Sequence, residues 1–232
     1  MIPFDLAVFD IAGTTVRDEK FVALAFQKAL ANGGHDVEIS QIDTVMGLAK
    51  PVAIGLVLEL DPNSEKVQAI HDDFRAEMVK FYQEDERVQP IEGATKVFSM
   101  LRENGVKVAL DTGFDREITD IILQRLGWDS SVLDGSMTVD EVAVGRPAPD
   151  MIQALMAQFG VVSPERVMKL GDTVSDMKEG RAAGCGLVIG VLSGTDSEES
   201  LEVENPDLIL GSVAELLDLD FSEIASQATT LE

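Results

Sequence analysis

The stretch FDLAVFDIAGTTV, residues 4–16, is an apolar run that reaches Asp10 and continues into small and hydroxyl residues. Residues 7–9 predict a short buried strand, and residues 12–15, which include Gly13, predict a tight loop whose backbone amides can approach an anion. A carboxylate at the carboxyl end of such a strand lies where open α/β sheets bind ligands. A second interpretation stays open here, in which Asp10 is only a turn residue between a strand and a capped helix.

The segment that follows is rich in helical patterns and contains no convincing strand. Apolar residues recur at helical spacing in residues 19–31, residues 39–46 can form a second helix, and residues 64–82 predict a long amphipathic helix. Pro51 favours a helix break or a new helix start. We therefore predict an all-helical insert over residues 17–88.

Beyond residue 88 the pattern changes to helices that alternate with short apolar strands. The expected helices span residues 94–104, 116–126, 150–159 and 175–183. The expected strands span residues 106–110, 131–133, 167–170 and 187–191. Two further segments, residues 207–210 and 213–217, close the series. Such alternation predicts a parallel sheet covered by helices on both faces. The predicted fold is α/β, a Rossmann-like doubly wound core (1–16 with 89–232) interrupted by the helical cap. The acidic segment 193–205 is expected to be a mobile loop.

The composition limits what the chain can bind. Eighteen Lys and Arg against 42 Asp and Glu give a net charge of −24, which argues against nucleic acid or an anionic membrane as partner. No apolar run approaches the roughly 20 residues of a membrane span, and the first residues do not resemble a secretory signal, so we expect a cytoplasmic protein. Cys185 is the only cysteine and is expected to be a buried filler. Leu231 and Glu232 read as an added remnant.

Polar residues stand at the ends of three expected strands. They are Asp10, Asp111 with Thr112, and Asp172 with Asp176. Because the carboxyl ends of parallel strands share one edge of the sheet, these groups can meet across a single crevice. Asp10, Asp172 and Asp176 would supply carboxylates to a hard cation that keeps waters, which favours Mg2+. Helix N-capping is the alternative role for Asp172 or Asp176 taken singly.

Four ordered motifs resemble those of the haloacid dehalogenase-like hydrolases, specifically the phosphonoacetaldehyde hydrolase (phosphonatase) branch. The motifs are DIAGTT at 10–15, DTG at 111–113, GRPAPD at 145–150 and GDTVSDMKEG at 171–180. The position of the helical insert matches too, so the resemblance covers nearly the whole chain. It implies an Mg2+-dependent hydrolase of a small phosphonate or phosphate, in a family where the cap can mediate homodimers.

The resemblance implies a role for each motif residue. Asp10 would attack phosphorus and become an aspartyl phosphate, which divides one difficult displacement into two steps. Thr112 would donate a hydrogen bond to a phosphoryl oxygen, and Arg146 would neutralise charge on the transferred group. The implied metal ligands are Asp10, the Ala12 carbonyl oxygen, Asp172 and, directly or through water, Asp176; the implied substrate-binding loop residues are Ala12, Gly13 and Gly113.

Ala12 stands where related phosphatases carry an acid that protonates the leaving group, and alanine has no proton to give. Phosphonoacetaldehyde cleavage needs no such proton, because a protonated imine between the aldehyde and a lysine draws electrons away and releases an enamine. Lys50, in MGLAK at residues 46–50, resembles the imine-forming lysine of the family, and Met46 matches as well. Without that motif, a lone lysine would be read as a solvated surface charge. Because the attacking amine must be neutral, burial or a neighbouring cation would have to lower the pKa of Lys50.

Three residues depart from the phosphonatase pattern. Ala53 replaces a histidine three residues after the lysine, Phe114 replaces a tyrosine, and Lys20 replaces a cysteine. Lys20 could be a second substrate cation, a neighbour that lowers the pKa of Lys50, or an exposed charge. The same scaffold could therefore act on a different substrate.

The leading hypothesis is Mg2+-dependent cleavage of a phosphonate C–P bond through Asp10 and Lys50. The nearest alternative is hydrolysis of a small phosphate monoester by the same nucleophile without the imine. A third hypothesis, from another class, is a non-catalytic binder of phospho-ligands on this fold.

Overall fold

The computed structural model describes residues 2–221 of the chain. At its centre is a six-stranded, entirely parallel sheet in the order β3-β2-β1-β4-β5-β6. The strands are β1 (Leu6–Phe9), β2 (Lys107–Thr112), β3 (Gly135–Thr138), β4 (Val167–Gly171), β5 (Leu187–Val191) and β6 (Leu208–Leu210). The strand order reverses at the central β1, and a ligand crevice forms outside the carboxyl end of the strands at such a switch point. The predicted α/β, Rossmann-like fold class is confirmed.

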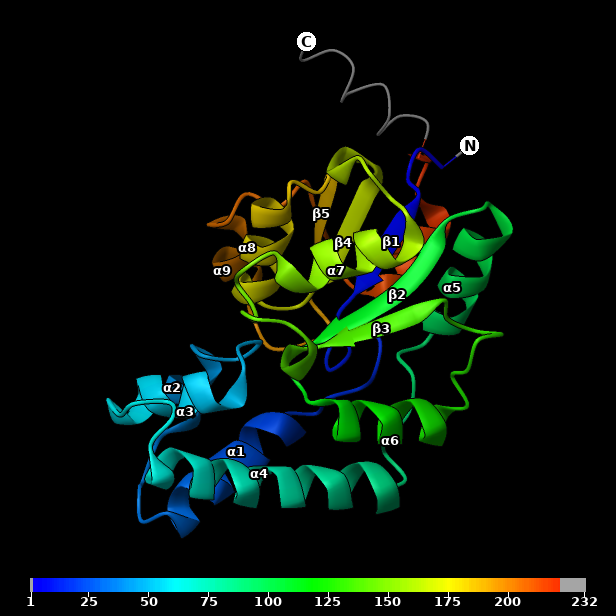
Figure 1. The fold of residues 1–232 in the computed structure, drawn as a ribbon. Helices are drawn as coiled ribbons and strands as arrows, with labels where there is room; N and C mark the ends of the chain where they lie inside the picture. The colour runs from blue at the N-terminus through cyan, green and yellow to red at the C-terminus, as the bar shows by residue number, and fades with distance from the viewer. Residues whose placement is uncertain (1, 222–232) are drawn as a thin grey trace.

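Helices cover both faces of the sheet (Figure 1). On one face lie α5 (Ala94–Glu103) and the 3-10 helix η3 (Val213–Asp218); on the other lie α7 (Asp150–Phe159), α8 (Val174–Ala183) and the short α9 (Glu198–Glu202). The alternation along β1 explains this arrangement, because Ala7 and Phe9 belong to the larger hydrophobic core while Leu6 and Val8 belong to the smaller core on the α7 and α8 face. Cys185 is buried in that smaller core, as predicted.

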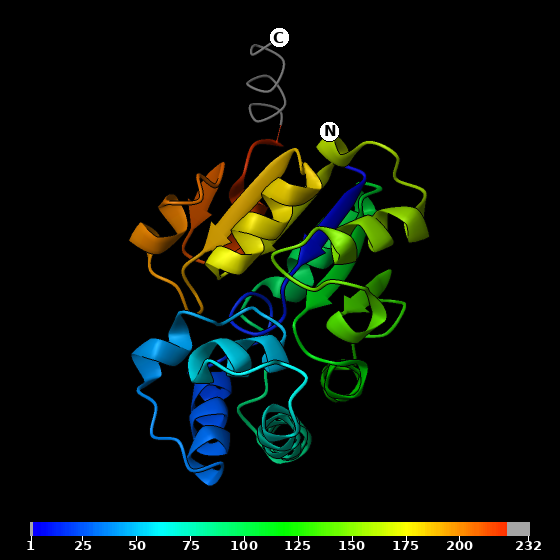
Figure 2. The ribbon, with the colours of Figure 1, turned by 60° about the vertical axis from the view of Figure 1, so that its left-hand side comes forward.

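The segment between β1 and α5 forms a separate layer of helices beyond the carboxyl edge of the sheet (Figures 1 and 2). Its helices are α1 (Phe21–Asn32), α2 (Ile39–Asp43), α3 (Lys50–Leu58) and α4 (Glu65–Glu84). The apolar stripe of α4 is buried, and the Phe74 ring meets the Phe26 ring of α1 edge-on at a centroid distance of 6.0 Å. The remaining helix, α6 (Arg116–Leu126), lies between the sheet and α4 (Figure 1).

The chain enters and leaves the helical layer through two adjacent segments. The Arg17 N–H donates to the Gln89 carbonyl at 3.0 Å, and the Ile91 N–H donates to the Thr15 carbonyl at 2.8 Å. The pairing ties the outgoing and returning chain together next to the loop that follows Asp10.

Several boundaries differ from the sequence predictions. The strand expected at 131–133 is wrong: that segment is a turn held by Asp129, whose carboxylate accepts from the Ser131 N–H, and the edge strand β3 begins at Gly135. The loop expected at 193–205 contains α9, whose N-cap Ser197 accepts from the Ser200 N–H. The second expected helix is shorter, the 213–217 segment is a 3-10 helix, and β2 runs through Thr112.

The remnant suggested at Leu231 and Glu232 lies outside the described residues. Among the helices of residues 2–221, none combines the length and apolar character needed to cross a bilayer.

Candidate active site

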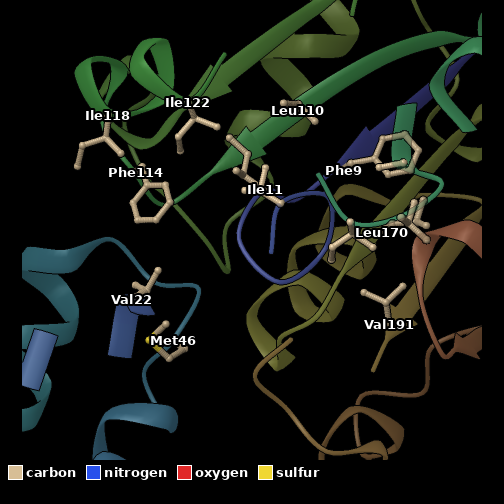
Figure 3. Close-up of a cluster of buried hydrophobic side chains, with 14 of the residues drawn as sticks. Phe9, Ile11, Val22, Met46, Leu110, Phe114, Ile118, Ile122, Leu170 and Val191 are labelled. Atoms are coloured by element: carbon tan, nitrogen blue, oxygen red, sulfur yellow. The ribbon is translucent and has the colours of Figure 1, made fainter. Parts of the chain in front are cut away.

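A small, partly open cavity lies between the carboxyl edge of the sheet and the helical layer. Its volume is about 30 Å3. It is lined by Asp10, Ala12, Val22, Met46, Gly47, Leu48, Lys50, Thr112, Gly113, Phe114, Arg146, Asp172, Thr173 and Thr195. Val22 and Met46 approach from the helical layer, toward the loop after β1 and Phe114 (Figure 3). The cavity thus combines the end of the central strand with side chains from the predicted insert.

The structure brings most of the predicted site residues to this cavity, but three of them do not line it. Gly13 is adjacent, since a Cβ at this position, where φ is +88°, would lie 2.6 Å from Asp172 Oδ2. Asp176 is fully buried beneath the cavity, whereas Lys20 is exposed on the chain just before α1. The structure therefore does not bring Lys20 to the site.

Asp10 follows β1 directly and extends the sheet ladder, because its N–H donates to the Leu170 carbonyl at 3.0 Å. Its carboxylate accepts from Arg146 Nη1 at 2.6 Å. Burial raises the pKa of Asp10 to about 6, and the neighbouring guanidinium opposes this rise. The carboxylate is therefore mainly ionised at neutral pH, which a nucleophile requires.

Arg146 belongs to a fully buried network of charges beneath Asp10. Its guanidinium also contacts Asp111, Asp176 and Glu179, with Nε 2.8 Å from Glu179 Oε2. Lys169 of β4 adds a second cation to the same three acids, at 3.1 Å from Asp176 Oδ1 and 3.0 Å from Glu179 Oε2. Arg146 thus reaches Asp10 from a network of acids that holds its guanidinium in place on several sides.

This network holds four acids and only two cations, and one retained proton would lower its excess of negative charge from two to one. Burial together with the Asp111 charge raises the pKa of Glu179 to about 8, whereas the pKa of Asp111 is lowered by Arg146 and Lys169. Asp111 Oδ2 and Glu179 Oε1 accept no hydrogen bond from a donor among the described residues. A proton on Glu179 directed at Asp111 would satisfy both atoms.

Asp172 is a buried carboxylate held in a fixed position without a cation. Thr14 Oγ1 donates to Oδ1 at 3.0 Å, and the Thr195 N–H donates to Oδ2 at 2.7 Å. Burial and the nearby Asp10 raise the pKa of Asp172 well above its usual value. Within residues 2–221 it forms no salt bridge. A buried carboxylate next to Asp10 that lacks a counter-charge fits a hard divalent cation.

A second set of acids, Asp10, Asp111 and Asp176, also has carboxylate oxygens within 4.8 Å of one another. Arg146 already contacts all three of these acids and Lys169 contacts two of them, so a divalent ion there would lie beside two cations. Of the predicted carboxylate ligands, Asp172 alone lacks a cation among the described residues, since Arg146 contacts both Asp10 and Asp176.

Lys50 occupies the opposite wall of the cavity, at the start of α3. It is 5% exposed, and its Nζ lies 5.7 Å from the Phe26 ring centroid and 5.5 Å from that of Phe74. Burial lowers the pKa of Lys50 to about 8, while Asp18 and Asp10 act to raise it. The lysine is therefore not a solvated surface charge, and at neutral pH it is mainly protonated with a minor neutral fraction.

Thr112, the last residue of β2, and Gly113, which follows it, also line the cavity. Thr112 Oγ1 accepts from the Phe114 N–H at 3.1 Å, which leaves its hydroxyl proton for a ligand. A Cβ on Gly113 would lie 3.1 Å from the Gly47 carbonyl oxygen, and one on Gly47 would lie 2.5 Å from Thr173 Oγ1. The loop before Lys50 therefore packs directly on the sheet edge, and glycine permits both approaches.

Sequence patterns did not reveal several residues of this site. Lys169 carried a signal, since a charge inside the apolar strand VMKLG requires a buried partner, and Glu179 lies one turn after Asp176 on α8. The sequence around Asp18 indicates only a capping residue before a helix, and its carboxylate accepts from the Val22 N–H. Thr195 contributes through its backbone amide. Backbone contacts of this kind depend on the folded chain rather than on residue type.

The fold and site together define a hydrolytic enzyme of the α/β class whose acidic sheet edge is covered by a helical layer. The profile of the haloacid dehalogenase-like hydrolases matches residues 4–184, and the chain belongs to this family.

Within that family the chain is similar to the phosphonoacetaldehyde hydrolases. It is 32% identical over 241 residues to the enzyme of that name from Bacillus cereus, covering 97% of this chain and 90% of the relative. A relative from Bacillus thuringiensis with the same name is 33% identical over 221 residues, covering 88% of this chain and 82% of the relative. The crystal structure of a phosphonoacetaldehyde hydrolase-like protein from Oleispira antarctica has the same fold, with a TM-score of 0.84 at 20% identity, covering 99% of this chain and 95% of that one.

Proposed function

We propose that the chain is an Mg2+-dependent phosphonatase that cleaves the C–P bond of phosphonoacetaldehyde or a related phosphonate. The observation that carries the proposal is that Lys50 is buried opposite Asp10 in one cavity, with its pKa lowered to about 8. An amine in this state can attack an aldehyde, and a carboxylate on the other wall can attack phosphorus. The names of the relatives agree with this chemistry.

In the proposed reaction, neutral Lys50 adds to the substrate aldehyde, and loss of water gives a protonated imine. An Asp10 oxygen then forms a bond to phosphorus as the C–P bond breaks, and the electron pair of that bond moves into the imine to give an enamine. Protonation at carbon and hydrolysis release acetaldehyde and free Lys50. Water attack on the aspartyl phosphate releases phosphate and restores Asp10. Ala12 fits this route because the enamine leaves without a proton from that position.

We assign the motif residues supporting roles. Asp10, the Ala12 carbonyl, Asp172 and Asp176 would hold Mg2+, which would neutralise phosphoryl charge when bound. Thr112 donates to a phosphoryl oxygen, and Arg146 places positive charge beside Asp10.

Residues 17–88 are proposed to act as a cap that opens and closes over the sheet. A cavity of about 30 Å3 holds little more than a water molecule. A substrate therefore requires the loop before Lys50 to move away from Gly113 and Thr173. Closure would then exclude water from the imine.

A screen for phosphate release with Mg2+ tests the proposal, with phosphonoacetaldehyde beside common phosphate esters. Lys50→Arg should abolish C–P cleavage and the borohydride-trapped adduct, whereas Lys28→Arg on the exposed side of α1 should change neither. Strong turnover of an ester without turnover of the phosphonate would reject the proposal.

A phosphatase acting on a small phosphate monoester is the second candidate. The observation that favours it is the charge of Lys50, since a pKa of about 8 beside Asp18 leaves the amine mainly protonated at neutral pH. A protonated Lys50 would bind an anionic substrate group instead of forming an imine. In this case Lys50→Arg should retain substantial turnover.

We also propose a cytoplasmic enzyme that forms a homodimer through the cap. A groove between α1 and α4, lined by apolar residues such as Leu24 and Phe81 together with several charged side chains, supports self-association, and Leu24 is 51% exposed. Leu24→Glu should shift the mass measured by light scattering to that of a monomer. The acidic net charge supports the absence of nucleic-acid and membrane partners.

A further inference from the structure

The loop after β5, residues 193–196, lies against both halves of the proposed metal site, although none of the four sequence motifs includes it. One half is the loop after β1, which follows Asp10, and the other is the turn after β4, which carries Asp172. The start of the loop is held on the sheet, because the Leu192 N–H donates to the Leu210 carbonyl of β6 at 2.9 Å. The loop therefore begins from a fixed support.

Two contacts join this loop to the segment after Asp10. Ser193 Oγ donates to the Gly13 carbonyl at 2.7 Å. Gly13 also lies directly against Gly194, because a Cβ on Gly13 would be 2.8 Å from the Gly194 Cα. The segment after Asp10 is thus held by a hydrogen bond and by close backbone packing, and neither contact involves a charged group.

The same loop holds Asp172. The Thr195 N–H donates to Asp172 Oδ2 at 2.7 Å, and the Asp196 N–H donates to the Asp172 carbonyl at 3.2 Å. A Cβ on Gly194 would collide with the Asp172 carboxylate, so only glycine permits this approach of the backbone. Asp196 Oδ2 accepts from the Val174 N–H at 2.7 Å, which ties the end of the loop to the first residue of α8.

Asp172 needs such support because of the charge beside it. It is 1% exposed and lines the same cavity as Asp10, so the two carboxylates repel each other when no ion lies between them. Among the described residues the donors to the Asp172 carboxylate are neutral, namely Thr14 Oγ1 at 3.0 Å and the Thr195 N–H. These neutral donors must therefore keep the carboxylate in place against the repulsion.

We infer that residues 193–196 are a positioning segment for the metal site: they fix the distance between the loop after β1 and the turn after β4, and so hold Asp10 and Asp172 in place for one Mg2+ ion. The inference rests on the proposed function, in which these two acids share the ion. The segment acts through Gly13 and Asp172 and does not itself coordinate Mg2+. Groups that orient metal ligands in this way typically contribute tenfold or more to metal affinity.

The simpler role of the segment is to stabilise the fold, and the variants are chosen to separate the two roles. Ser193→Ala removes the hydroxyl that binds the Gly13 carbonyl and leaves every charge in place. Ser193→Thr keeps a hydroxyl at this position. Gly194→Ala adds a methyl group that would displace the Asp172 carboxylate. Ser197→Ala is the matched control, because Ser197 caps α9 and its side-chain hydrogen bonds go only to Ser200.

Two quantities are measured for each metal-free protein: the free energy of unfolding in urea, and the Mg2+ dissociation constant by isothermal titration calorimetry. Ser193→Ala should raise the dissociation constant by about tenfold, and Gly194→Ala should raise it further. Ser193→Thr should bind Mg2+ as the wild type does. Ser197→Ala should lose stability to an extent similar to Ser193→Ala, since each loses one hydrogen bond, but its Mg2+ dissociation constant should not change.

An unchanged Mg2+ dissociation constant in folded Ser193→Ala would overturn the inference, whatever the loss of stability. An equal loss of affinity in Ser197→Ala would also overturn it, because the effect would then follow stability alone. If Ser193→Ala does not fold, Gly194→Ala provides the same test. A wild type that binds no Mg2+ would reject the metal site of the proposed function and the inference with it, and this failure is distinguishable because it appears without any substitution.

Discussion

Glu179→Gln should stabilise the protein at neutral pH, although it removes a fully buried acid that contacts two cations. Glu179 Oε2 accepts from Arg146 Nε at 2.8 Å and lies 3.0 Å from Lys169 Nζ. Its other oxygen, Oε1, and Asp111 Oδ2 have no hydrogen-bond partner among the described residues, and a protonated Glu179 carboxyl group directed at Asp111 would satisfy both atoms. A glutamine reproduces this pattern, because its oxygen accepts from the cations and its amide nitrogen donates to Asp111.

The magnitude follows from the proton that Glu179 must take up on folding. Its pKa rises from 4.5 to about 8 because of burial first and the Asp111 charge second. A folded-state pKa above the unfolded one means that stability is lost as pH rises from 4.5 to 8. At about 1.4 kcal/mol per pH unit, the loss reaches at most about 3.5 kcal/mol at pH 7 and about 5 kcal/mol above pH 8. A glutamine at position 179 does not titrate, so it adds no such pH dependence to the stability of the protein.

Urea unfolding of the wild type and Glu179→Gln between pH 5 and 9, without added metal, measures this difference. The advantage of the variant should be small at pH 5 and should grow steadily up to pH 8. Glu202→Gln on the exposed side of α9 is the control and should show no such growth. A constant difference across this range, or a loss of more than about 1 kcal/mol at pH 7, would refute the proton on Glu179.

Two further predictions concern the metal site and the cap. Asp172→Asn should lower the affinity for Mg2+ by more than about tenfold, measured by Mg2+-dependent thermal shift, because it halves the charge that Asp172 and Asp10 present to the ion. Gly47→Ala should lower kcat/KM well beyond its stability cost of about 1 kcal/mol, since its Cβ would collide with Thr173 on closure. Gly105→Ala, with a similar φ and open space around it, should show the stability cost alone.

The sequence was sufficient for the fold class because its signals were local and repeated. Strands of apolar residues alternated with amphipathic helices, and the one helical block without a strand marked the insert. The prediction at 131–133 was wrong because an edge strand such as GSMT of β3 has no apolar pattern, whereas the turn before it does. Edge strands are chosen by pairing with a neighbour, which a single segment does not reveal.

The cavity residues were predictable in part because they too give local signals in the sequence. Asp10, Thr112 and Asp172 stand at strand ends, and topology alone places such ends together. The support beneath them was not predictable, because Lys169 and Glu179 are recognisable only through partners distant in the chain. Lys20 was a candidate site residue because of its place in the family pattern, but its side chain is exposed and does not line the cavity.

Burial acts in opposite directions on the two groups that face each other in the cavity, and this provides a test between the two candidate reactions. It raises the pKa of Asp10 to about 6 and lowers that of Lys50 to about 8. An imine mechanism needs both groups deprotonated, so kcat/KM should keep rising as pH passes 8. A phosphatase that uses Lys50 as a cation needs the ammonium, so its kcat/KM should fall above pH 8. Bound Mg2+ would lower the pKa of Asp10 and so move the rise of kcat/KM at acidic pH to lower values, but it would not change the difference between the two mechanisms above pH 8. There, the sign of the change in kcat/KM with pH decides whether Lys50 acts as a nucleophile or as a charge.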